Sequence, residues 1–522
     1  MDWQSFSKHF YSFTDLQLAM DLSCLDMDET WMTSMAPAIE NAMLEMKALE
    51  EGAIANADEQ RMVGHYWLRA PELAPDAHLA QAIRDDLAQV LALSEKVLSG
   101  SCLTPGGKPF SRLLLVGIGG SALGPQFVSA ALAQTGCLPI SFLDNTDPDG
   151  IKGVLDAIAG DLAQTLVMVI SKSGGTPETR NGMLEVRARF AAAGYEFPGQ
   201  AVAVTGVGSV LETLAREEGW LDILHMYDWI GGRTSEFSAV GLLPAALQGI
   251  DICAMLAGAR EMDEATRRAD PRQNPAMLLA LAWYKAGNGR GERNMVILPY
   301  KDRLQLFSRY LQQLVMESLG KDVDRKGKTV HQGITVYGNK GSTDQHAYVQ
   351  QLRDGPADFF ATFIEVLDDG VDHPLEVKPG VYSGDYLYGF LRGTRRALSD
   401  TGRTSLVLTL DALNAKTLGG VVALYERAVG LYASLIDVNA YHQPGVEAGK
   451  KAAEEILSLQ CRVVQALSEA GEPMVLAELA SKVGAHDTVE EVYCLLRRLA
   501  ANGRISLDEA PGDDGGPVAS AL

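Results

Sequence analysis

Apolar residues at helical spacing dominate the first part of the chain. Between residues 28 and 49, large apolar side chains recur every three or four positions, at Trp31, Met35, Ile39, Met43 and Met46. Side chains at this spacing share one face of a helix, so the pattern predicts an amphipathic helix. Little in residues 1–74 indicates strands, and we predict that this stretch is a helical segment packed on the core of the protein.

From residue 75 onward, short continuous apolar runs alternate with longer stretches of helical spacing. Each run is rich in Val, Ile or Leu and is followed by polar or small residues. This pattern is typical of buried parallel strands connected by helices. The runs form two series, which predict two doubly wound α/β domains at residues 75–260 and 261–468. The first series comprises residues 113–118, 140–143, 166–170 and 201–204, and the second comprises 295–298, 334–337, 363–367 and 406–410.

Helical spacing returns after the second series. Two long helices are predicted first, and after Gly471 two short helices precede a short apolar run. The short elements predict a small helix-turn-helix-like unit at residues 469–510. Residues 511–522 are rich in Gly, Pro and Asp, a composition that predicts a disordered tail. The predicted helices are residues 421–435, 447–466, 475–483 and 489–500, and the run is 505–507.

Composition narrows the class of protein. The 522 residues are 47% hydrophobic and carry a net charge of -22, which suits a soluble protein with two or three cores and disfavours nucleic acid as the main partner. No apolar run approaches about 20 residues, so no membrane span is expected. No basic head precedes an apolar stretch near Met1, so no signal peptide is expected. The six cysteines form no CxxC pair, which predicts reduced, mostly buried thiols in a cytoplasmic protein.

A glycine-rich turn follows the first buried run. Ligands of parallel sheets bind beyond the carboxyl ends of the strands, so this turn is a candidate site. Residues 116–125 read VGIGGSALGP, and Gly120 would let the backbone approach a ligand while Ser121 offers a hydroxyl at a helix start. The glycine spacing differs from GxGxxG, which disfavours a dinucleotide site. A purely structural tight turn is the alternative.

A second polar turn follows the third run, where residues 171–179 read SKSGGTPET. The hydroxyls of Ser171, Ser173 and Thr176 can donate to phosphate oxygens, and Lys172 adds positive charge. The turn lacks the longer spacer of a Walker A loop, so a monophosphate on a small molecule is favoured over a nucleoside triphosphate. An ordinary capped helix start is the alternative.

Together the two turns resemble those of sugar-isomerase (SIS) domains, and further segments resemble the glucose-6-phosphate isomerase family. Those segments occur in the family's order, and the resemblance implies two SIS-type domains and an aldose–ketose isomerase that needs no cofactor. The unit after Gly471 is not part of the family's common core. The chain differs from the usual family residues at Thr234, Gly174 and Gly175. We expect these differences to affect how the substrate fits more than they affect the reaction. The matching segments are 231–235 (GGRTS), 316–318 with 320–321 (MES, GK), 341–347 (GSTDQHA) and 441–450 (YHQPGVEAGK).

The resemblance also implies roles for individual residues. Isomerisation moves a proton from C2 to C1 of the open sugar, and Glu317 is the implied base, in an apolar run that predicts partial burial. Arg233 is the implied partner of the cis-enediolate. Without the family match, Glu317 would be interpreted as a solvated helix residue and Arg233 as a structural one.

Ring opening and substrate binding complete the implied site. His346 and Lys450 would open the sugar ring, with the histidine supplied by the second subunit of a homodimer. Gln313 precedes Glu317 by one helical turn, and both it and Gln443 would hold sugar or phosphate oxygens. Glu178 would orient the substrate, and a helix first-turn glutamate is its alternative role.

Two other functions remain open at this stage, besides a side activity on mannose 6-phosphate. A metal-dependent isomerase would need clustered His, Asp and Glu ligands, and none occurs at ligand spacing. A sugar-phosphate sensor would pair a SIS domain with a DNA-binding helix-turn-helix unit. The basic residues of the last unit are few and lie among acidic ones: Lys482, Arg497, Arg498 and Arg504 against Glu490, Glu491, Asp508 and Glu509.

Overall fold

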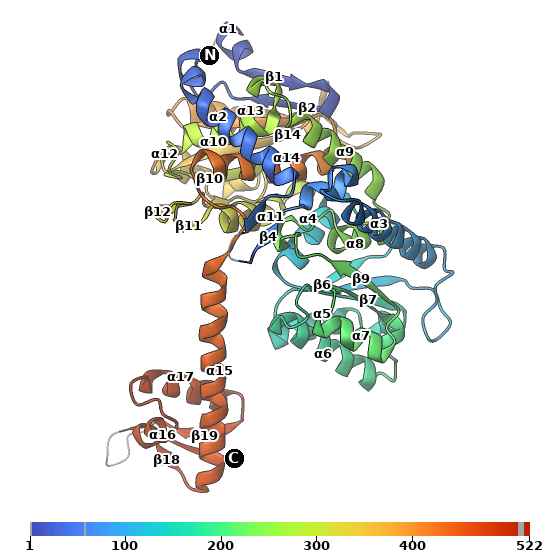
Figure 1. The fold of residues 1–522 in the computed structure, drawn as a ribbon, viewed down its shortest axis with the longest axis vertical. Coiled ribbons are helices and arrows are strands. Elements are labelled where there is room, and N and C mark those ends of the chain that lie inside the picture. The colour runs from blue at the N-terminus through green and yellow to red at the C-terminus, as the bar shows by residue number, and fades with distance from the viewer. Residues whose placement is uncertain (1–2, 57–58, 510–515) are drawn as a thin grey trace. The chain divides into compact units, whose positions relative to one another are not determined.

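A computed structural model describes residues 3–56, 59–509 and 516–522 (Figure 1). The chain divides into two compact units, Met1–His442 and Gln443–Leu522. The first contains both predicted α/β sheets, and the second contains the small C-terminal elements. Each unit is described separately below.

The first sheet has five parallel strands in the order β6-β5-β7-β8-β9. Alternate residues of β5 belong to different hydrophobic cores. Leu113 and Leu115 pack in the core that includes α3, α4 and α8. Leu114 and Val116 pack in the core that includes α5, α6 and α7. Helices therefore cover both faces of the sheet, as Figure 1 shows and as predicted for a doubly wound domain. Strand β9 was not predicted. The strands are β5 (Arg112–Val116), β6 (Ile140–Leu143), β7 (Thr165–Ser171), β8 (Ala201–Gly206) and β9 (Asp222–Met226), and the helices are α3 (Ala77–Leu98), α4 (Leu123–Leu132), α5 (Pro148–Ala157), α6 (Pro177–Ala192), α7 (Val210–Glu218) and α8 (Ala239–Leu247).

The second sheet has six strands in the order β1-β2-β17-β14-β10-β13. The four predicted strands are present and parallel, and the N-terminal hairpin of β1 and β2 adds an antiparallel edge. The strands are β1 (Phe10–Phe13), β2 (Leu18–Asp21), β10 (Asn294–Pro299), β13 (Val336–Tyr337), β14 (Phe359–Val366) and β17 (Ser405–Leu410).

The prediction of a purely helical N-terminal segment is therefore wrong. Helix α2 (Glu29–Glu50) is present as predicted, with Asp28 accepting a hydrogen bond from the Trp31 amide at its start. However, β2 pairs with β17, and a short pair, β3 (Ile54–Asn56) and β4 (Arg61–Met62), follows α2. The strands are at most four residues long and β2 meets its partner far along the chain, so local spacing could not reveal them.

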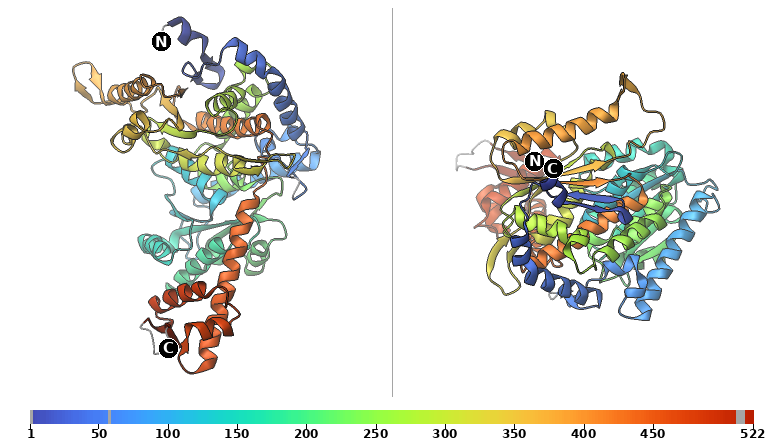
Figure 2. Two further views of the ribbon diagram at one scale, coloured as in Figure 1. Left: turned by 90° about the vertical axis from the view of Figure 1, so that its left-hand side faces the viewer. Right: turned by 90° about the horizontal axis from the view of Figure 1, so that it is seen from above.

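Helix α14 (Ala415–Leu435) is buried along nearly its whole length. It packs on α9 (Ile252–Ala265), and Gly419 permits this contact because a Cβ there would lie 2.0 Å from the Met255 carbonyl oxygen. The remaining elements of this unit are α1 (Trp3–Lys8), α10 (Pro275–Ala286), α11 (Phe307–Leu311), α12 (Val349–Asp354), α13 (Ser383–Ser399) and two hairpins, β11 (Lys321–Val323) with β12 (Thr329–Gln332) and β15 (Glu376–Lys378) with β16 (Val381–Tyr382). The second hairpin projects from the unit in both views of Figure 2.

A buried ionic cluster ties Glu50, Tyr66 and Arg69 to α9 and α14. Arg69 donates to both carboxylate oxygens of Asp263 at 2.7 and 2.9 Å, and Arg427 donates to the same carboxylate at 2.7 Å. Arg427 also lies over the Tyr66 ring, with its guanidinium carbon 3.8 Å from the ring centroid, and pairs with Glu50. Although burial opposes it, the two guanidiniums lower the pKa of Asp263.

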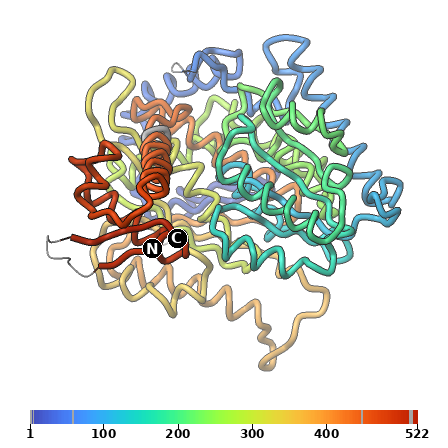
Figure 3. The backbone as a smooth tube through the Cα atoms, turned by 90° about the horizontal axis from the view of Figure 1, so that it is seen from below, coloured from blue at the N-terminus to red at the C-terminus, as the bar shows by residue number. Residues whose placement is uncertain are grey.

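The second unit consists of three helices and a small antiparallel sheet of order β18-β20-β19. The chain order helix, strand, helix, helix, strand, strand is that of a winged helix, a helix-turn-helix fold with an added hairpin. The elements are α15 (Pro444–Ala470), β18 (Met474–Val475), α16 (Leu476–Lys482), α17 (Val489–Ala501), β19 (Ile505–Asp508) and β20 (Val518–Ala521). Figure 3 shows α15 end-on.

Two predictions for this region need correction. Residues 518–521 of the predicted disordered tail form β20, which pairs with both β18 and β19 and buries Ala519; residues 511–515 lie outside the described part. The unit also starts at Gln443 instead of residue 469, because α15 is continuous to Ala470 and its second half belongs to the core of the unit.

All six cysteines are free, in agreement with the prediction of reduced thiols. The prediction that most of them are buried is wrong, since three are partly exposed and three are exposed. Among the helices of residues 3–56, 59–509 and 516–522, none is both long and apolar enough to cross a membrane.

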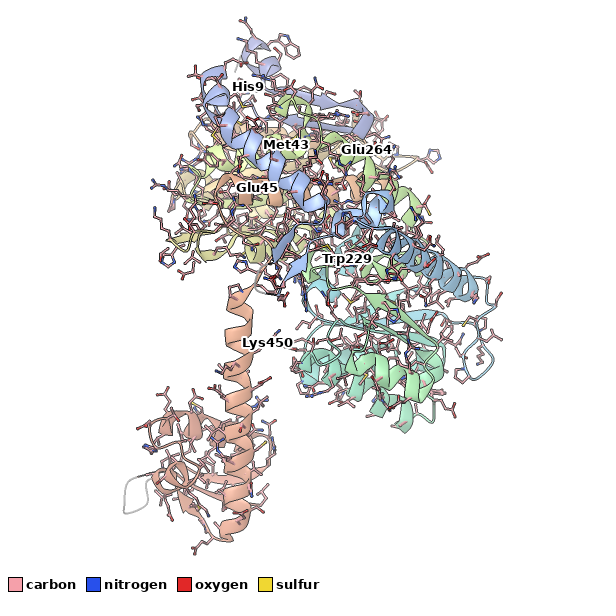
Figure 4. All side chains as sticks on the ribbon, in the orientation of Figure 1. His9, Met43, Glu45, Trp229, Glu264 and Lys450 are labelled. Carbon is pink, nitrogen blue, oxygen red and sulfur yellow. The ribbon has the colours of Figure 1, made fainter. Side chains whose placement is uncertain are left out.

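The ionic cluster predicts a large effect of Asp263→Ala on folding. The substitution leaves the guanidiniums of Arg69 and Arg427 buried without their shared carboxylate, and we expect a loss of about 3–5 kcal/mol in the free energy of unfolding. Equilibrium unfolding in urea measures it. Glu264→Ala is the matched control, since Glu264 is the next residue, lies at the surface (Figure 4) and has a side chain that is 58% exposed. Equal stability of the two variants would contradict the structural role of the cluster.

Candidate active site

The glycine-rich turn and the loop that carries Arg233 lie against each other. The turn is a short 3-10 helix, η4 (Gly119–Ser121), directly after β5, and the loop forms η7 (Gly232–Thr234). A Cβ at Gly120 would lie 2.0 Å from the Gly232 carbonyl oxygen, so only glycine fits there. The Ser235 hydroxyl lies 2.7 Å from the Gly232 carbonyl oxygen and 3.3 Å from that of Gly120. The two segments therefore form one backbone surface at the carboxyl end of the sheet.

The second polar turn connects β7 to α6. Ser171, the last residue of β7, donates its hydroxyl to Thr176 at 3.2 Å, and the Ser173 hydroxyl accepts from the Gly175 amide at 3.2 Å. Pro177 begins α6, and the N-terminus of that helix carries partial positive charge. The turn therefore places hydroxyls beside the N-terminus of a helix, an arrangement that can hold an anion. Glu178 lies half-buried in the first turn of the helix.

Lys172 holds a neighbouring segment of main chain. Its ammonium donates to the carbonyl oxygens of Asp228 at 3.0 Å and Ile230 at 2.9 Å. Burial, and next the charge of Arg61, lower the pKa of Lys172 to about 8. From the sequence, we expect this lysine to add positive charge to the phosphate-binding turn. The structure gives this lysine main-chain partners just before Gly231, so it also fixes the approach to Arg233.

Arg233 and Glu317 form an ion pair in a mostly buried position. Nη1 of Arg233 lies 3.3 Å from Oε1 of Glu317, and the two side chains are 7% and 19% exposed. Arg233 also donates to the carbonyl oxygens of Ala440 and His442. Burial lowers the pKa of Arg233, and Glu317 opposes that shift. The structure therefore brings together the predicted base and the predicted guanidinium.

Glu317 ends a π-helical turn, η10 (Gln312–Glu317), which directly follows α11. Such turns are rare and often occur at functional sites. Gln313 lies in the same turn and reaches the glycine-rich turn, because a Cβ at Gly119 would lie 3.3 Å from its Nε2. Leu314 and Val315 are buried behind it. Gln313, Glu317, Arg233 and the glycine-rich turn thus converge at the end of the first sheet.

Lys321 is a site-lining residue whose role the sequence left unassigned. It lies in a segment that resembled the family, but nothing local distinguished it from a surface lysine. Its ammonium donates to the carbonyl oxygens of Glu317 at 2.8 Å and His442 at 3.1 Å. Burial lowers the pKa of Lys321 to about 8, with Arg233 the next cause. With Arg233, it supplies positive charge at the site of a strongly acidic protein.

His346 is not joined to the Arg233–Glu317 pair. It is exposed in a 3-10 turn, η11 (Asp344–His346), and no hydrogen bond or ion pair among the described residues links it to Glu317. The turn itself is fixed, because Asp344 accepts from the Asn339 amide at 2.9 Å and from the Tyr348 hydroxyl at 2.6 Å.

Gln443 and Lys450 belong to the second unit. Gln443 is the residue before α15, and Lys450 is an exposed residue of that helix (Figure 4). Within the first unit, the preceding carbonyl, that of His442, is bound by both Arg233 and Lys321. No group of three or more His, Cys, Asp or Glu side chains in the described residues is placed to hold a metal ion.

Comparison with known proteins gives consistent matches. The sequence model described as phosphoglucose isomerase matches residues 21–373 and 396–468. A glucose-6-phosphate isomerase of Nostoc punctiforme is 59% identical over 503 residues, which cover 96% of this chain and 95% of the relative. One from a Synechococcus species is 56% identical over 520 residues, 99% of this chain and 97% of the relative, so its alignment includes the second unit.

Solved structures agree with the sequence matches. A glucose-6-phosphate isomerase of Chlamydia trachomatis superposes with a TM-score of 0.79 at 27% identity, covering 88% of this chain and 92% of the other. A hypothetical protein of Thermus thermophilus superposes with a TM-score of 0.70 at 28% identity, covering 84% of this chain and 99% of the other. Since the family model, the close relatives and the site geometry agree, the chain belongs to the phosphoglucose isomerase family.

Proposed function

We propose that this enzyme interconverts D-glucose 6-phosphate and D-fructose 6-phosphate, with Glu317 as the base that moves a proton between C2 and C1. The observation that carries the proposal is the partly buried pair of Glu317 and Arg233 beside the glycine-rich turn. The names of the close relatives support the same reaction.

The phosphate of the substrate would bind at the two polar turns. Hydroxyls of Ser171, Ser173 and Thr176 can donate to its oxygens, and the start of α6 adds partial positive charge. Gly120 and Ser121 would hold the adjoining part of the substrate, where Gly120 keeps the backbone surface open. This arrangement fixes one end of the sugar and directs the other end toward Glu317.

Isomerisation proper then needs one base and one fixed positive charge. The Glu317 carboxylate takes the proton from C2 of the open aldose, the C2–H electrons form the C1–C2 double bond of a cis-enediol(ate), and the π electrons of the C1 carbonyl move to O1. Glu317 then gives a proton to C1, while O2 loses its proton and becomes the C2 carbonyl and O1 gains a proton. The proton held on Glu317 can exchange with water before it is returned, so solvent deuterium can enter the sugar. Arg233 lies 3.3 Å from that carboxylate and can stabilise the oxygen on which negative charge develops. Gln313, over the glycine-rich turn, can hold a sugar hydroxyl.

Ring opening requires an acid and a base near the ring oxygen and the C1 hydroxyl. We assign it to Lys450 and to His346 of a second subunit in a homodimer, and we assign Gln443 to substrate binding. Support comes from the matching segments 341–347 and 441–450, and from the exposure of His346 on a fixed turn. Such an enzyme would serve glycolysis and gluconeogenesis in the cytoplasm.

Glu317→Gln tests the base. The amide keeps the size of the side chain but cannot take a proton, so we expect kcat for fructose 6-phosphate to fall by about 10²–10⁴-fold, with sugar-phosphate binding retained by calorimetry. Glu40→Gln, at an exposed position of α2, is the control and should match the wild-type enzyme. Solvent deuterium should enter the sugar only when Glu317 is present. Wild-type turnover by Glu317→Gln would remove it as the base.

Mixing two inactive variants tests the shared site. In a mixed dimer of Glu317→Gln and His346→Asn, one of the two sites contains both wild-type residues if the histidine comes from the other subunit. Random reassociation at equal amounts should then restore about a quarter of the wild-type activity, since half of the dimers are mixed and each has one intact site. No recovery, with mixed dimers verified by mass spectrometry, would show that each site uses its own histidine.

The winged-helix order of the second unit favours one other candidate, a sugar-phosphate sensor that binds DNA. Its charges argue against this function. Helix α17 begins with Glu490 and Glu491, and Arg497 pairs with Glu509 at 3.2 Å. We therefore expect no binding to random duplex DNA in fluorescence anisotropy at about 0.1 M salt. Salt-dependent binding that Arg498→Glu abolishes would establish the sensor instead.

A further inference from the structure

Lys321 places a charged ammonium inside the protein between two main-chain segments. It is the first residue of β11 and only 6% exposed. Its Nζ donates to the Glu317 carbonyl oxygen at 2.8 Å and to the His442 carbonyl oxygen at 3.1 Å. A buried ammonium is costly unless it is hydrogen-bonded, so these contacts account for its position.

These contacts connect Lys321 to Arg233 and to the proposed base through shared hydrogen-bond acceptors. Arg233 pairs with the Glu317 carboxylate at 3.3 Å and also donates to the His442 carbonyl at 3.3 Å. Glu317 is therefore held at both ends, its carboxylate by Arg233 and its carbonyl by Lys321. Arg233 and Lys321 both donate to the same acceptor, the carbonyl oxygen of His442.

We propose that Lys321 is a positioning residue for the isomerase reaction, which fixes the π-helical turn of Glu317 against the His442 peptide and so aims the carboxylate. This inference rests on the proposed role of Glu317 as the base. The competing explanation is an ordinary cap, in which a lysine near a helix C-terminus satisfies a last carbonyl and contributes to stability alone. The contact to His442 goes beyond such a cap, because it joins the helix to a segment more than 100 residues away.

The charged surroundings of Lys321 give the proposal a pH signature. The guanidinium of Arg233 and the carboxylate of Glu317 face it, and His442, which offers its carbonyl, directs its own Nδ1 to the Asn439 carbonyl at 3.2 Å. Burial first, and then Arg233, lower the pKa of Lys321 to about 8, while Glu317 opposes the shift. As the pH rises above about 8, the ammonium loses its charge and its charge-assisted bonds weaken.

Activity and stability should respond to this titration in opposite directions. In the unfolded chain a lysine has a pKa of about 10.4, so between about pH 8 and 10.4 the unfolded state binds more protons at this site than the folded state. The contribution of Lys321 to folding stability therefore rises with pH over that window. Its contribution to catalysis falls over the same window if it aims Glu317, and a cap that acts only on stability would not produce that fall.

The experiment compares Lys321→Met, Lys321→Arg and Lys328→Met in the full-length enzyme. Lys328→Met is the matched control, since Lys328 is exposed on the same hairpin. For Lys321→Met we expect kcat to fall about 10–100-fold, because a base displaced by about 1 Å loses rate to this extent, with KM changed far less. For the wild-type enzyme we expect kcat to decline as the pH rises above about 8. Lys321→Arg keeps a permanent charge, so it should retain most of kcat and should not show this decline.

Two results would overturn the proposal. One is a Lys321→Met enzyme with wild-type kcat. The other is a Lys321→Arg enzyme whose kcat still declines as the pH rises above about 8. That result would assign the decline of kcat to another group such as Lys172. If Lys321→Met does not fold by circular dichroism, the arginine variant decides alone. These results can be told apart from a failure of the proposed function, because that failure would be seen as turnover by the Glu317→Gln enzyme.

Discussion

Arg233 keeps a guanidinium that is only 7% exposed inside a protein of net charge -22. It can do so because the Glu317 carboxylate and the carbonyl oxygens of Ala440 and His442 replace the water that burial removes. The same contacts decide where Glu317 lies. The position of the proposed base, the position of the main chain at Ala440 and His442, and the positive charge at the site all depend on how the protein solvates this one side chain.

The rest of the first unit supports that arrangement from two sides. The parallel sheet brings the glycine-rich turn and the loop of Arg233 to one edge, where Gly120 and Gly232 touch backbone to backbone. From the other side, the ionic cluster of Arg69, Asp263 and Arg427 fixes the N-terminal segment. That segment carries Gly64, whose amide donates to the Trp229 carbonyl at 3.0 Å just before Gly231. Rigid elements thus surround a site made of short turns.

The sequence predicts what local patterns encode. Strands buried on both faces, such as β5 and β7, are continuous apolar runs, and turns after them are visible as Gly and Ser clusters. Pairings between distant segments leave no such pattern, so β2 beside β17 and β20 beside β18 were missed. The partners of single lysines are equally nonlocal. The sequence indicates only that Lys172 adds charge to a polar turn and assigns no role to Lys321, and only the folded structure gives their carbonyl acceptors.

The position of β2 between β1 and β17 also constrains the order of events during synthesis. Leu18 pairs with Leu410, so the hairpin emerges from the ribosome nearly 400 residues before its partner exists. Until then its free edge is open to other strands, which is the geometry that invites mispairing. Folding of the second sheet therefore finishes late, and a nascent chain that stalls before residue 405 presents an unprotected strand at its N-terminal end.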